Sequence, residues 1–371
     1  MKLTTMQLRD LAIGAAFLGT GGGGDPYIGR LMVQTCLDAG LEVEIIAPAA
    51  LADDATVIPT AMMGATTVLV EKPPSGEEAV AALKRLETRI GRRADATMPI
   101  EIGGINSTIP LLVGALLGLP VVDADGMGRA FPQLEMETFG VYGISGSPMA
   151  ITNEHGDCVL IEARDNRQME WLARGVTMRM GGCAYIAEYA MSGADVKRTA
   201  IPHTLTLAIR IGEVIRQAKA NQEPPIEALL RFLPSTLYKF GRAIFAGKII
   251  DVHRETKAGF AVGRARIEAL HPSAAIMEIE IQNEFLVARV DGKVRAIVPD
   301  LICILDSESA DPITTENLRY GQRVTVVAVS VPEIIRSPAA LAVFGPACFG
   351  LAEPFTPIET LENLGLGGAP A

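Results

Sequence analysis

The stretch Gly19-Thr20-Gly21-Gly22-Gly23-Gly24-Asp25-Pro26 decides how the N-terminal part of the chain folds. Glycine costs about 0.5–1 kcal/mol relative to alanine inside a regular element, so this run predicts a loop whose backbone approaches something closely. Asp25 is a good helix N-cap and Pro26 suits the first helical position, which predicts a helix over residues 27–39. The N–H groups and helix dipole there favour a carboxylate, a phosphate or a polarised carbonyl oxygen.

The glycine run does not match the common nucleotide-binding motifs. A Walker loop continues with Gly-Lys-Ser/Thr, whereas this run ends in Asp25-Pro26, and Asp25 would repel a phosphate. A dinucleotide fingerprint follows a strand, whereas apolar residues recur over residues 6–18 at the one-face spacing of a helix. Two interpretations stay open, a ligand-binding loop and a tight turn between two helices.

Length and composition limit the classes of protein. With 371 residues, 49% of them hydrophobic, the chain is long enough for two domains. Its 43 acidic and 33 basic residues give a net charge of -10, which argues against nucleic-acid and anionic-membrane partners. The five cysteines form no CxxC pair, and the sequence has neither a signal-peptide core nor an apolar run of about 18 residues. We therefore expect a cytoplasmic protein with reduced thiols.

Residues 41–122 alternate between apolar strand-like segments and amphipathic helices, which predicts a parallel sheet with helices on both faces. The N-terminal domain should therefore be a three-layer, Rossmann-like α/β domain, and ligands on such sheets bind beyond the carboxyl ends of the strands. The expected strands are 41–47, 57–63, 98–102 and 120–122, and the expected helices are 77–90 and 107–117.

The second half of the chain has a different pattern. A strand is expected at 176–180, and we place the domain boundary near residue 170, which gives domains 1–170 and 171–371. Short strands with turn signals follow from about 248 to 331, and the dipeptide Asp291-Gly292 between apolar runs predicts a hairpin. This part should form a C-terminal, mostly β, barrel-like module.

Two polar, glycine-bearing loops follow strands of the predicted sheet. Each has a purely structural explanation, since Asn106 or Ser107 could cap a helix and Asp123 with Asp125 could shape a turn. Because the carboxyl ends of parallel strands lie at one edge of a sheet, we expect both loops to share a site with the first glycine loop. The two loops are Ile100-Glu101-Ile102-Gly103-Gly104-Ile105-Asn106-Ser107 and Val122-Asp123-Ala124-Asp125-Gly126-Met127-Gly128-Arg129-Ala130.

These three motifs resemble a bacterial family associated with S-methyl thiohydantoin desulfurase and often linked to hydantoinase/oxoprolinase genes. The resemblance extends over most of the chain, from the N-terminal α/β domain to the C-terminal β-rich domain. It implies a hydantoin- or thiohydantoin-like cyclic substrate and a reaction in which water attacks a ring carbon, with loss of sulfide or a thiol. It carries no catalytic residue across, so the roles below come from residue chemistry.

Loop carboxylates are the candidates for moving protons in such a reaction. We predict Asp123 and Asp125 as the first choices for the base that takes the water proton, with Glu101 next. Oriented N–H groups of the glycine loops would stabilise charge on the heteroatom. Asp25 would orient the ligand, and Arg129 would hold a substrate carboxylate in a bidentate pair. The complete predicted substrate-binding set is Gly21, Gly22, Gly23, Gly24, Asp25, Gly103, Gly104, Asn106, Ser107 and Arg129.

A metal-dependent version of the reaction stays open. Asp123, Asp125 and Glu101 offer oxygen ligands, and His155 or His203 could complete a zinc-like set. No HxH, HExxH or CxxC spacing supports such a set. The cofactor is therefore undecided, with a divalent metal as one option.

The alternative is a non-catalytic protein that binds a ligand or regulates a hydantoinase/oxoprolinase-type enzyme, because the sequence offers no recognisable nucleophile–base pair. Cys183 follows two glycines but has no positioned base in the sequence, so we expect an ordinary small apolar residue there. In either case we expect a small-molecule ligand and a homo-oligomer, with neither nucleic acid nor membrane as a partner.

Overall fold

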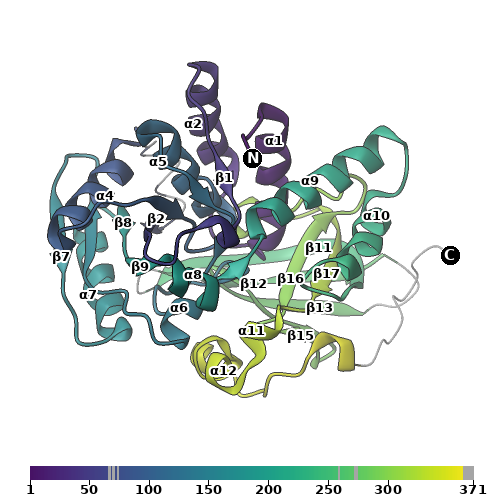
Figure 1. The fold of residues 1–371 in the computed structure, drawn as a ribbon. Helices are drawn as coiled ribbons and strands as arrows, with labels where there is room; N and C mark the ends of the chain where they lie inside the picture. Colours follow the sequence, from purple (N-terminus) through teal and green to yellow (C-terminus); the bar gives the residue numbers. More distant parts are fainter. Residues whose placement is uncertain (66–67, 69–71, 73–74, 258–259, 271–274, 362–371) are drawn as a thin grey trace.

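The computed structural model describes residues 1–65, 68, 72, 75–257, 260–270 and 275–361. Figure 1 shows two units beside each other, a mixed sheet with helices drawn in purple to teal and a second sheet drawn in green. The expected architecture is confirmed, because the N-terminal unit is α/β and the C-terminal unit is an antiparallel sheet that curls into a half-barrel. None of the described helices is long and apolar enough to cross a membrane.

The N-terminal sheet has the strand order β1-β4-β3-β2-β8-β6-β7, with β9 beside β2. Its strands are β1 (Ile45–Ile46), β2 (Thr56–Gly64), β3 (Ala96–Met98), β4 (Val121–Val122), β6 (Met149–Thr152), β7 (Cys158–Ile161), β8 (Cys183–Ala187) and β9 (Met191–Ser192). The first four run parallel, whereas β8, β6 and β7 extend the sheet in antiparallel pairs. Four parallel strands are confirmed, but two of the predicted ranges are wrong: β1 covers only the end of 41–47, and β3 ends at Met98, so most of 98–102 is loop. The antiparallel extension makes the whole sheet mixed.

Helices lie on both faces of this sheet. The α-helices in the described part of the chain are α1 (Thr5–Leu18), α2 (Pro26–Asp38), α4 (Glu77–Ile90), α5 (Ile109–Leu117), α6 (Thr138–Val141), α7 (Asn166–Arg179), α8 (Gly193–Thr199), α9 (Thr204–Ala220), α10 (Pro225–Phe232), α11 (Glu333–Arg336) and α12 (Pro338–Phe344). Residues of β2 alternate between two cores. Ile58 and Met62 pack with α4 and α5, whereas Val57 and Met63 pack with α7 and α8. The unit therefore has three layers.

The glycine run connects α1 to α2. Pro26 is the first residue of α2, and Asp25 caps this helix by accepting a hydrogen bond from the Tyr27 N–H at 2.9 Å, as predicted. Gly23 has a φ of 70°, which glycine adopts without the strain that a side chain would bring. The loop is thus a turn between helices and, as described below, also a wall of a cavity.

The predicted strand at 176–180 is wrong, because α7 continues to Arg179. Met169, Ala173 and Val176 recur at helical spacing and pack together on the sheet, so Val176 belongs to the apolar face of α7. The next strand, β8, begins at Cys183 and pairs with β2. The N-terminal sheet therefore includes a strand from beyond residue 171.

The C-terminal sheet has the order β15-β14-β13-β12-β11-β17-β16, and every pair is antiparallel. Its strands are β11 (Gly241–Lys257), β12 (Phe260–Ala269), β13 (Ile276–Gln282), β14 (Glu284–Val290), β15 (Lys293–Ile297), β16 (Leu301–Asp306) and β17 (Arg323–Val329). The predicted hairpin at Asp291-Gly292 is confirmed, since these residues join β14 to β15 with φ values of 50° and 77°.

The two units share one apolar core. α1 and α9 pack along each other, and a Cβ atom at Gly14 would overlap the backbone of Ala208, so glycine permits the close crossing. Leu11 of α1, Leu205 of α9 and Leu301 of β16 belong to the same buried cluster. The second unit is thereby packed directly against the first, which fixes the cavity between them.

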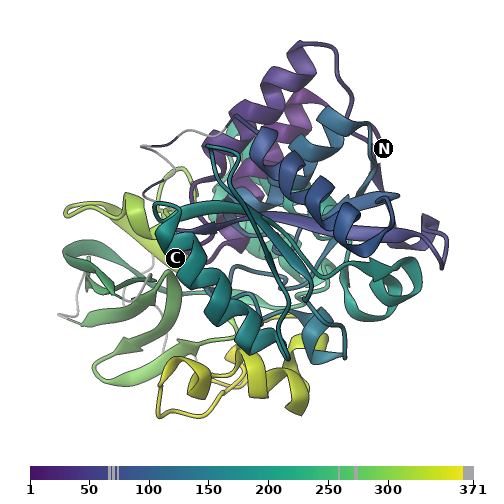
Figure 2. The same ribbon diagram turned by 90° about the vertical axis from the view of Figure 1, so that its left-hand side faces the viewer.

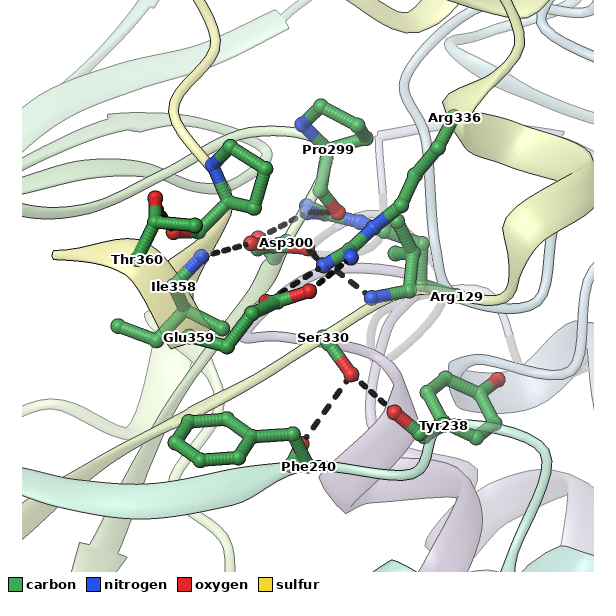
Figure 3. Close-up of polar contacts among 12 residues, drawn as sticks. Arg129, Tyr238, Phe240, Pro299, Asp300, Ser330, Arg336, Ile358, Glu359 and Thr360 are labelled. Carbon is green, nitrogen blue, oxygen red and sulfur yellow. Dashed lines mark hydrogen bonds and ion pairs between the residues drawn. The ribbon is translucent and has the colours of Figure 1, made fainter.

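A buried carboxylate orders the C-terminal side of this junction. Asp300 is fully buried and accepts hydrogen bonds from the Val331 N–H, the Ile358 N–H and Arg336 at 2.8–3.0 Å (Figure 3). Arg129, from the N-terminal unit, donates to the carbonyl oxygens of Pro299 at 2.9 Å and Asp300 at 3.0 Å. A loop of the N-terminal unit is thus hydrogen-bonded directly to the C-terminal sheet.

Candidate functional site

A small cavity lies where the N-terminal sheet meets the half-barrel. Its volume is about 60 Å³, enough for about four water molecules and below the range of about 300–1,000 Å³ that is usual for small-molecule sites. Its walls come from the glycine loop, the end of β2, the loops after β3 and β4, α7 and the turn between β13 and β14. Its wall includes the glycines Gly22 and Gly23 and the polar residues Glu101, Asn106, Arg174 and Glu284.

Glu101 lies in this wall, three residues after β3, and is 5% exposed. Its Oε1 accepts a hydrogen bond from Nδ2 of Asn106 at 2.7 Å. The backbone of Met62 in β2 holds that amide, donating to Oδ1 at 2.7 Å and accepting from Nδ2 at 3.0 Å. Burial raises the pKa of Glu101 to about 8, although the hydrogen bonds from Asn106 and from the Phe131 backbone act in the opposite direction.

Glu284, the first residue of β14, lies in the wall formed by the C-terminal unit and is 2% exposed. A Cβ atom at Gly22 would overlap its Oε1, so the glycine leaves the space that this carboxyl group occupies. Its Oε2 has no hydrogen-bond partner among the described residues. Burial raises the pKa of Glu284 well above its usual value, and the nearby Glu101 raises it further, while Arg129 lowers it. Two interacting carboxyl groups from different units therefore line one cavity.

Asp125 lies behind the cavity wall and is fully buried. Its Oδ2 accepts hydrogen bonds from the N–H groups of Ile102 at 2.9 Å, Met127 at 3.1 Å and Gly128 at 2.7 Å. Burial raises its pKa to about 7 despite these bonds. Asp125 thus joins the loop after β3 to its own loop and positions the backbone beside Glu101.

Two further carboxyl groups, Glu137 and Glu188, are fully buried near this wall. Neither oxygen of either group has a hydrogen-bond partner in the described part of the chain. Burial raises both pKa values well above the usual range, and the charges of Glu188, Asp125 and Glu101 raise that of Glu137 further. These groups cannot all be ionised at neutral pH without compensating cations.

The structure places Asp123 outside the cavity wall. Its Oδ1 accepts from the Thr206 N–H at 3.0 Å and its Oδ2 from the Thr206 hydroxyl at 2.5 Å, at the start of α9. Nδ1 of His203 lies 3.4 Å from Oδ2. Asp123 therefore satisfies the first turn of a helix, and the structure does not bring it together with Glu101 on the cavity wall.

The predicted glycines divide between the cavity and the packing behind it. Gly22 and Gly23 line the cavity. Gly21 packs against the ring of Phe285. Gly24 is buried beside the start of α2, and Asp25 is exposed and caps that helix. Gly103 packs against Ala130, and Gly104 packs against Gly23.

Arg129 and Ser107 are buried and donate hydrogen bonds to backbone carbonyl groups, while Nη2 of Arg129 has no partner among the described residues. Arg129 donates to the carbonyl oxygens of residues 130, 299 and 300, and its guanidinium lies 4.6 Å from the centre of the Phe131 ring. Burial lowers its pKa to about 10. Ser107 donates to the Gly104 carbonyl at 2.7 Å. The arginine on the cavity wall is instead Arg174, which pairs with Glu170 and donates to the Pro132 carbonyl at 2.9 Å.

No group of three or more His, Cys, Asp or Glu side chains within the described ranges could hold a metal ion. Of the two candidate histidines, His203 lies beside Asp123 and His155 is exposed beside Glu154. Cys183 is buried, and burial raises the pKa of its thiol to about 12, which suits a packed side chain better than a nucleophile.

Comparison with known proteins decides the family. Residues 6–163 match the model for the S-Me-THD-like N-terminal domain, and residues 164–358 match that for the S-Me-THD-like C-terminal domain. The chain belongs to the S-Me-THD-like family. A crystal structure of a protein from Chromobacterium violaceum is also similar, with 25% sequence identity, a TM-score of 0.79, and 96% of this chain and 100% of that chain covered. No curated protein matches the chain.

Glu284 and Arg174 are among the residues of this S-Me-THD-like protein's cavity that sequence reasoning missed. Glu284 follows Asn283 between two apolar runs, where a polar pair is typical of an exposed turn. Arg174 lies on α7, a helix that the capping residues Asp165 and Asn166 indicate, but nothing in the sequence shows that this side chain faces the cavity. Only the contact between Glu284 and Gly22 identifies Glu284 as a cavity residue, and these two residues lie far apart in the sequence.

Proposed function

We propose that this S-Me-THD-like protein hydrolyses a hydantoin- or thiohydantoin-like ring, with water attacking a ring carbon. The observation that carries the proposal is the pair Glu101 and Glu284, two buried carboxyl groups from different units on the wall of one small cavity. Two interacting carboxyl groups of raised pKa share protons, so one can be ionised while the other stays protonated at the same pH.

The reaction requires one base and one acid. Glu101, whose pKa is about 8, accepts the proton of the attacking water as the C–O bond forms. The C–S bond to the leaving group then breaks, the electron pair goes to sulfur, and Glu284 supplies the proton that releases a thiol. The second water proton, carried by the new hydroxyl group, moves to the ring nitrogen, or to the leaving sulfur where hydrogen sulfide forms. The products are the ring carbonyl compound and the sulfur species, and the two carboxyl groups have exchanged one proton.

Three residues have positioning roles in this proposal. Asn106 orients Glu101, Asp125 fixes the loop that carries it, and Gly22 leaves room for Glu284. Asp123, the first choice for the base from sequence, is assigned to the N-terminus of α9.

The test is to incubate purified protein with an S-methyl thiohydantoin, a thiohydantoin and a hydantoin, and to measure thiol, sulfide and ring opening. Thiol or sulfide release, or ring opening, that depends on Glu101 supports the proposal. Absence of turnover with all three compounds contradicts it.

A non-catalytic role is the second candidate, and one observation favours it. Burial favours the neutral forms of Glu101 and Glu284, and neutral carboxyl groups can bind the N–H and C=O groups of an imide ring without chemistry. Ligand-induced thermal stabilisation without turnover, together with co-purification with a hydantoinase/oxoprolinase-type enzyme, would favour this candidate.

A further inference from the structure

A second and larger hollow lies along α7. This helix is on the side of the molecule that faces the viewer in Figure 2. Its volume is about 970 Å³, near the upper end of the range of about 300–1,000 Å³ for small-molecule sites. The residues that matter for its chemistry are Arg167, Trp171, Arg174, Gly175, Arg179 and Phe260. This hollow is called the α7 groove below.

The α7 groove adjoins the buried cavity. Gln133 and Arg174 line both hollows. Arg174 is held in place by its ion pair with Glu170 and its hydrogen bond to the Pro132 carbonyl. Gln133 and Arg174 are thus the boundary that a substituent of a ligand in the cavity would cross to enter the groove.

The groove offers an apolar, flat contact surface. Trp171 is 70% exposed and Met178 is 58% exposed, although both are large apolar residues. A Cβ atom at Gly175, one helical turn after Trp171, would meet nothing within 4 Å, which leaves an open notch beside the indole. Phe260 lies on the groove wall and receives the guanidinium of Arg174 at 4.4 Å from its ring centre. Planar groups stack well on such side chains.

The charges of the groove favour an anion. Arg167 and Arg179, at opposite ends of α7, are exposed, and neither has an ion-pair partner in the part of the chain described. The acids of the groove are engaged: Glu170 pairs with Arg174, and Asp157 accepts from Asn153 at 2.9 Å. Burial raises the pKa of Glu135 to about 7 against the opposing effect of Arg174 and Arg167, so its charge is partly suppressed near neutral pH.

We propose that the α7 groove binds a flat, acidic substituent of the ligand whose ring occupies the buried cavity. The planar part of this arm stacks beside Trp171 over Gly175, and its carboxylate pairs with Arg167 or Arg179. Only the identity of the ring rests on the function proposed above. Binding of the arm depends on the groove alone.

Trp171 is the single tryptophan of the chain, so its fluorescence reports on the groove directly. Phenylacetate serves as a minimal planar acid, and phenylacetamide is its neutral counterpart. We expect phenylacetate to change the Trp171 emission saturably and to bind about 5-fold more tightly than phenylacetamide, the ratio expected for one solvent-exposed ion pair of about 1 kcal/mol.

Charge variants identify the anion's partner. We expect Arg167→Gln or Arg179→Gln to weaken phenylacetate binding by about 3- to 5-fold, with no effect on phenylacetamide. Arg9→Gln, an exposed arginine on α1, is the matched control and should bind like the unaltered protein. Thermal unfolding checks that every variant folds. An unchanged emission up to the solubility limit, equal binding of the two probes, or unchanged binding in both groove variants would each overturn the proposal.

The failure of this proposal is distinguishable from that of the hydrolase proposal. Glu101→Gln should leave phenylacetate binding unchanged, because Glu101 does not line the groove. If turnover of thiohydantoins is found, an acidic aryl substituent should lower KM in the unaltered protein, and Arg167→Gln or Arg179→Gln should raise it without changing kcat. If KM is the same with and without the acidic substituent, the groove assignment is contradicted and the hydrolase proposal is not.

Discussion

Glu101, three residues after β3 of the N-terminal sheet, and Glu284, the first residue of β14 in the C-terminal half-barrel, line the same cavity from different units. Each is at most 5% exposed, and the charge of Glu101 raises the pKa of Glu284. Neither unit alone contains the pair. The site therefore depends on how the two units dock, as well as on the loops that carry the side chains.

The pH dependence of turnover should follow Glu101. As a base with a pKa of about 8, it becomes active as it loses its proton, so kcat/KM should rise from pH 6 towards pH 8 and above. Asp125 raises the pKa of Glu101, so Asp125→Asn should move this rise to lower pH. Rates measured from pH 5.5 to 9.5 test both expectations. A flat profile over this range, or the same profile in the variant, would show that another group is the base.

Two glycine substitutions should separate function from stability. Gly22→Ala places a methyl group against the end of the Glu284 side chain, which can move, so we expect a loss of turnover or ligand binding with a change of less than about 1 kcal/mol in unfolding free energy. Gly104→Ala places a methyl group against the Gly23 backbone at a φ of 64°, so it should cost about 2 kcal/mol or more.

Denaturant unfolding and turnover, measured on both glycine variants, check this contrast. A Gly22→Ala protein with full turnover would show that the position of Glu284 is unimportant. A Gly104→Ala protein of unaltered stability would contradict the described contact between the two glycine loops.

Glu137 should make stability depend on pH. Burial raises its folded-state pKa well above the unfolded value, so the folded protein binds the proton more tightly. Its contribution to stability is therefore fully present below the unfolded pKa and is lost as pH rises towards the folded pKa. Glu137→Gln keeps a neutral side chain at every pH. The difference in unfolding free energy between this variant and the unaltered protein should therefore shift by about 1–3 kcal/mol in favour of the variant from pH 5 to pH 8.

Denaturant melts at pH 5 and pH 8 test this expectation. Glu308→Gln, an exposed carboxylate on the far loop after β16, is a suitable control and should show no such difference. If the two pH values give the same effect for Glu137→Gln, this carboxyl group is compensated by a cation or a hydrogen bond that the structure does not show.

The junction at Asp300 should matter more for stability than its surface neighbour Glu359. Asp300→Ala removes the partner of buried N–H groups and of Arg336, which should cost about 3–5 kcal/mol. Glu359→Gln breaks the other ion pair of Arg336, in which the glutamate side chain is 36% exposed, and should cost less than about 1 kcal/mol. Equal effects in denaturant unfolding would contradict the assigned role of Asp300.

Local signals predicted the parts of the fold that depend on near neighbours in sequence. Asp25-Pro26 marked the start of α2, and Asp291-Gly292 marked the β14–β15 hairpin. The strand-then-glycine pattern also singled out Glu101 and Asn106, which the structure brings together at 2.7 Å. In each case the residue types required by the backbone geometry lie within a few positions of one another.

Features that depend on distant contacts could not be predicted in the same way. Asp123 is a carboxylate in a glycine-bearing loop, which is typical of a site residue. Its partners, however, are Thr206 and His203 on another segment, and it caps the helix that begins there. In the sequence Glu284 resembles a turn residue, whereas in the structure the glycine loop packs over it. The wrong strand at 176–180 arose because a short apolar run fits either a buried strand or the end of an amphipathic helix.

The most direct measurement compares thiol release from an S-methyl thiohydantoin by the unaltered protein, Glu101→Gln, Glu284→Gln and Asp123→Asn, with folding of each checked by thermal unfolding. The account predicts release by the unaltered protein and Asp123→Asn, and a loss of about 100-fold or more in both glutamate variants. Full release by folded Glu101→Gln and Glu284→Gln, with a loss in Asp123→Asn, would contradict it.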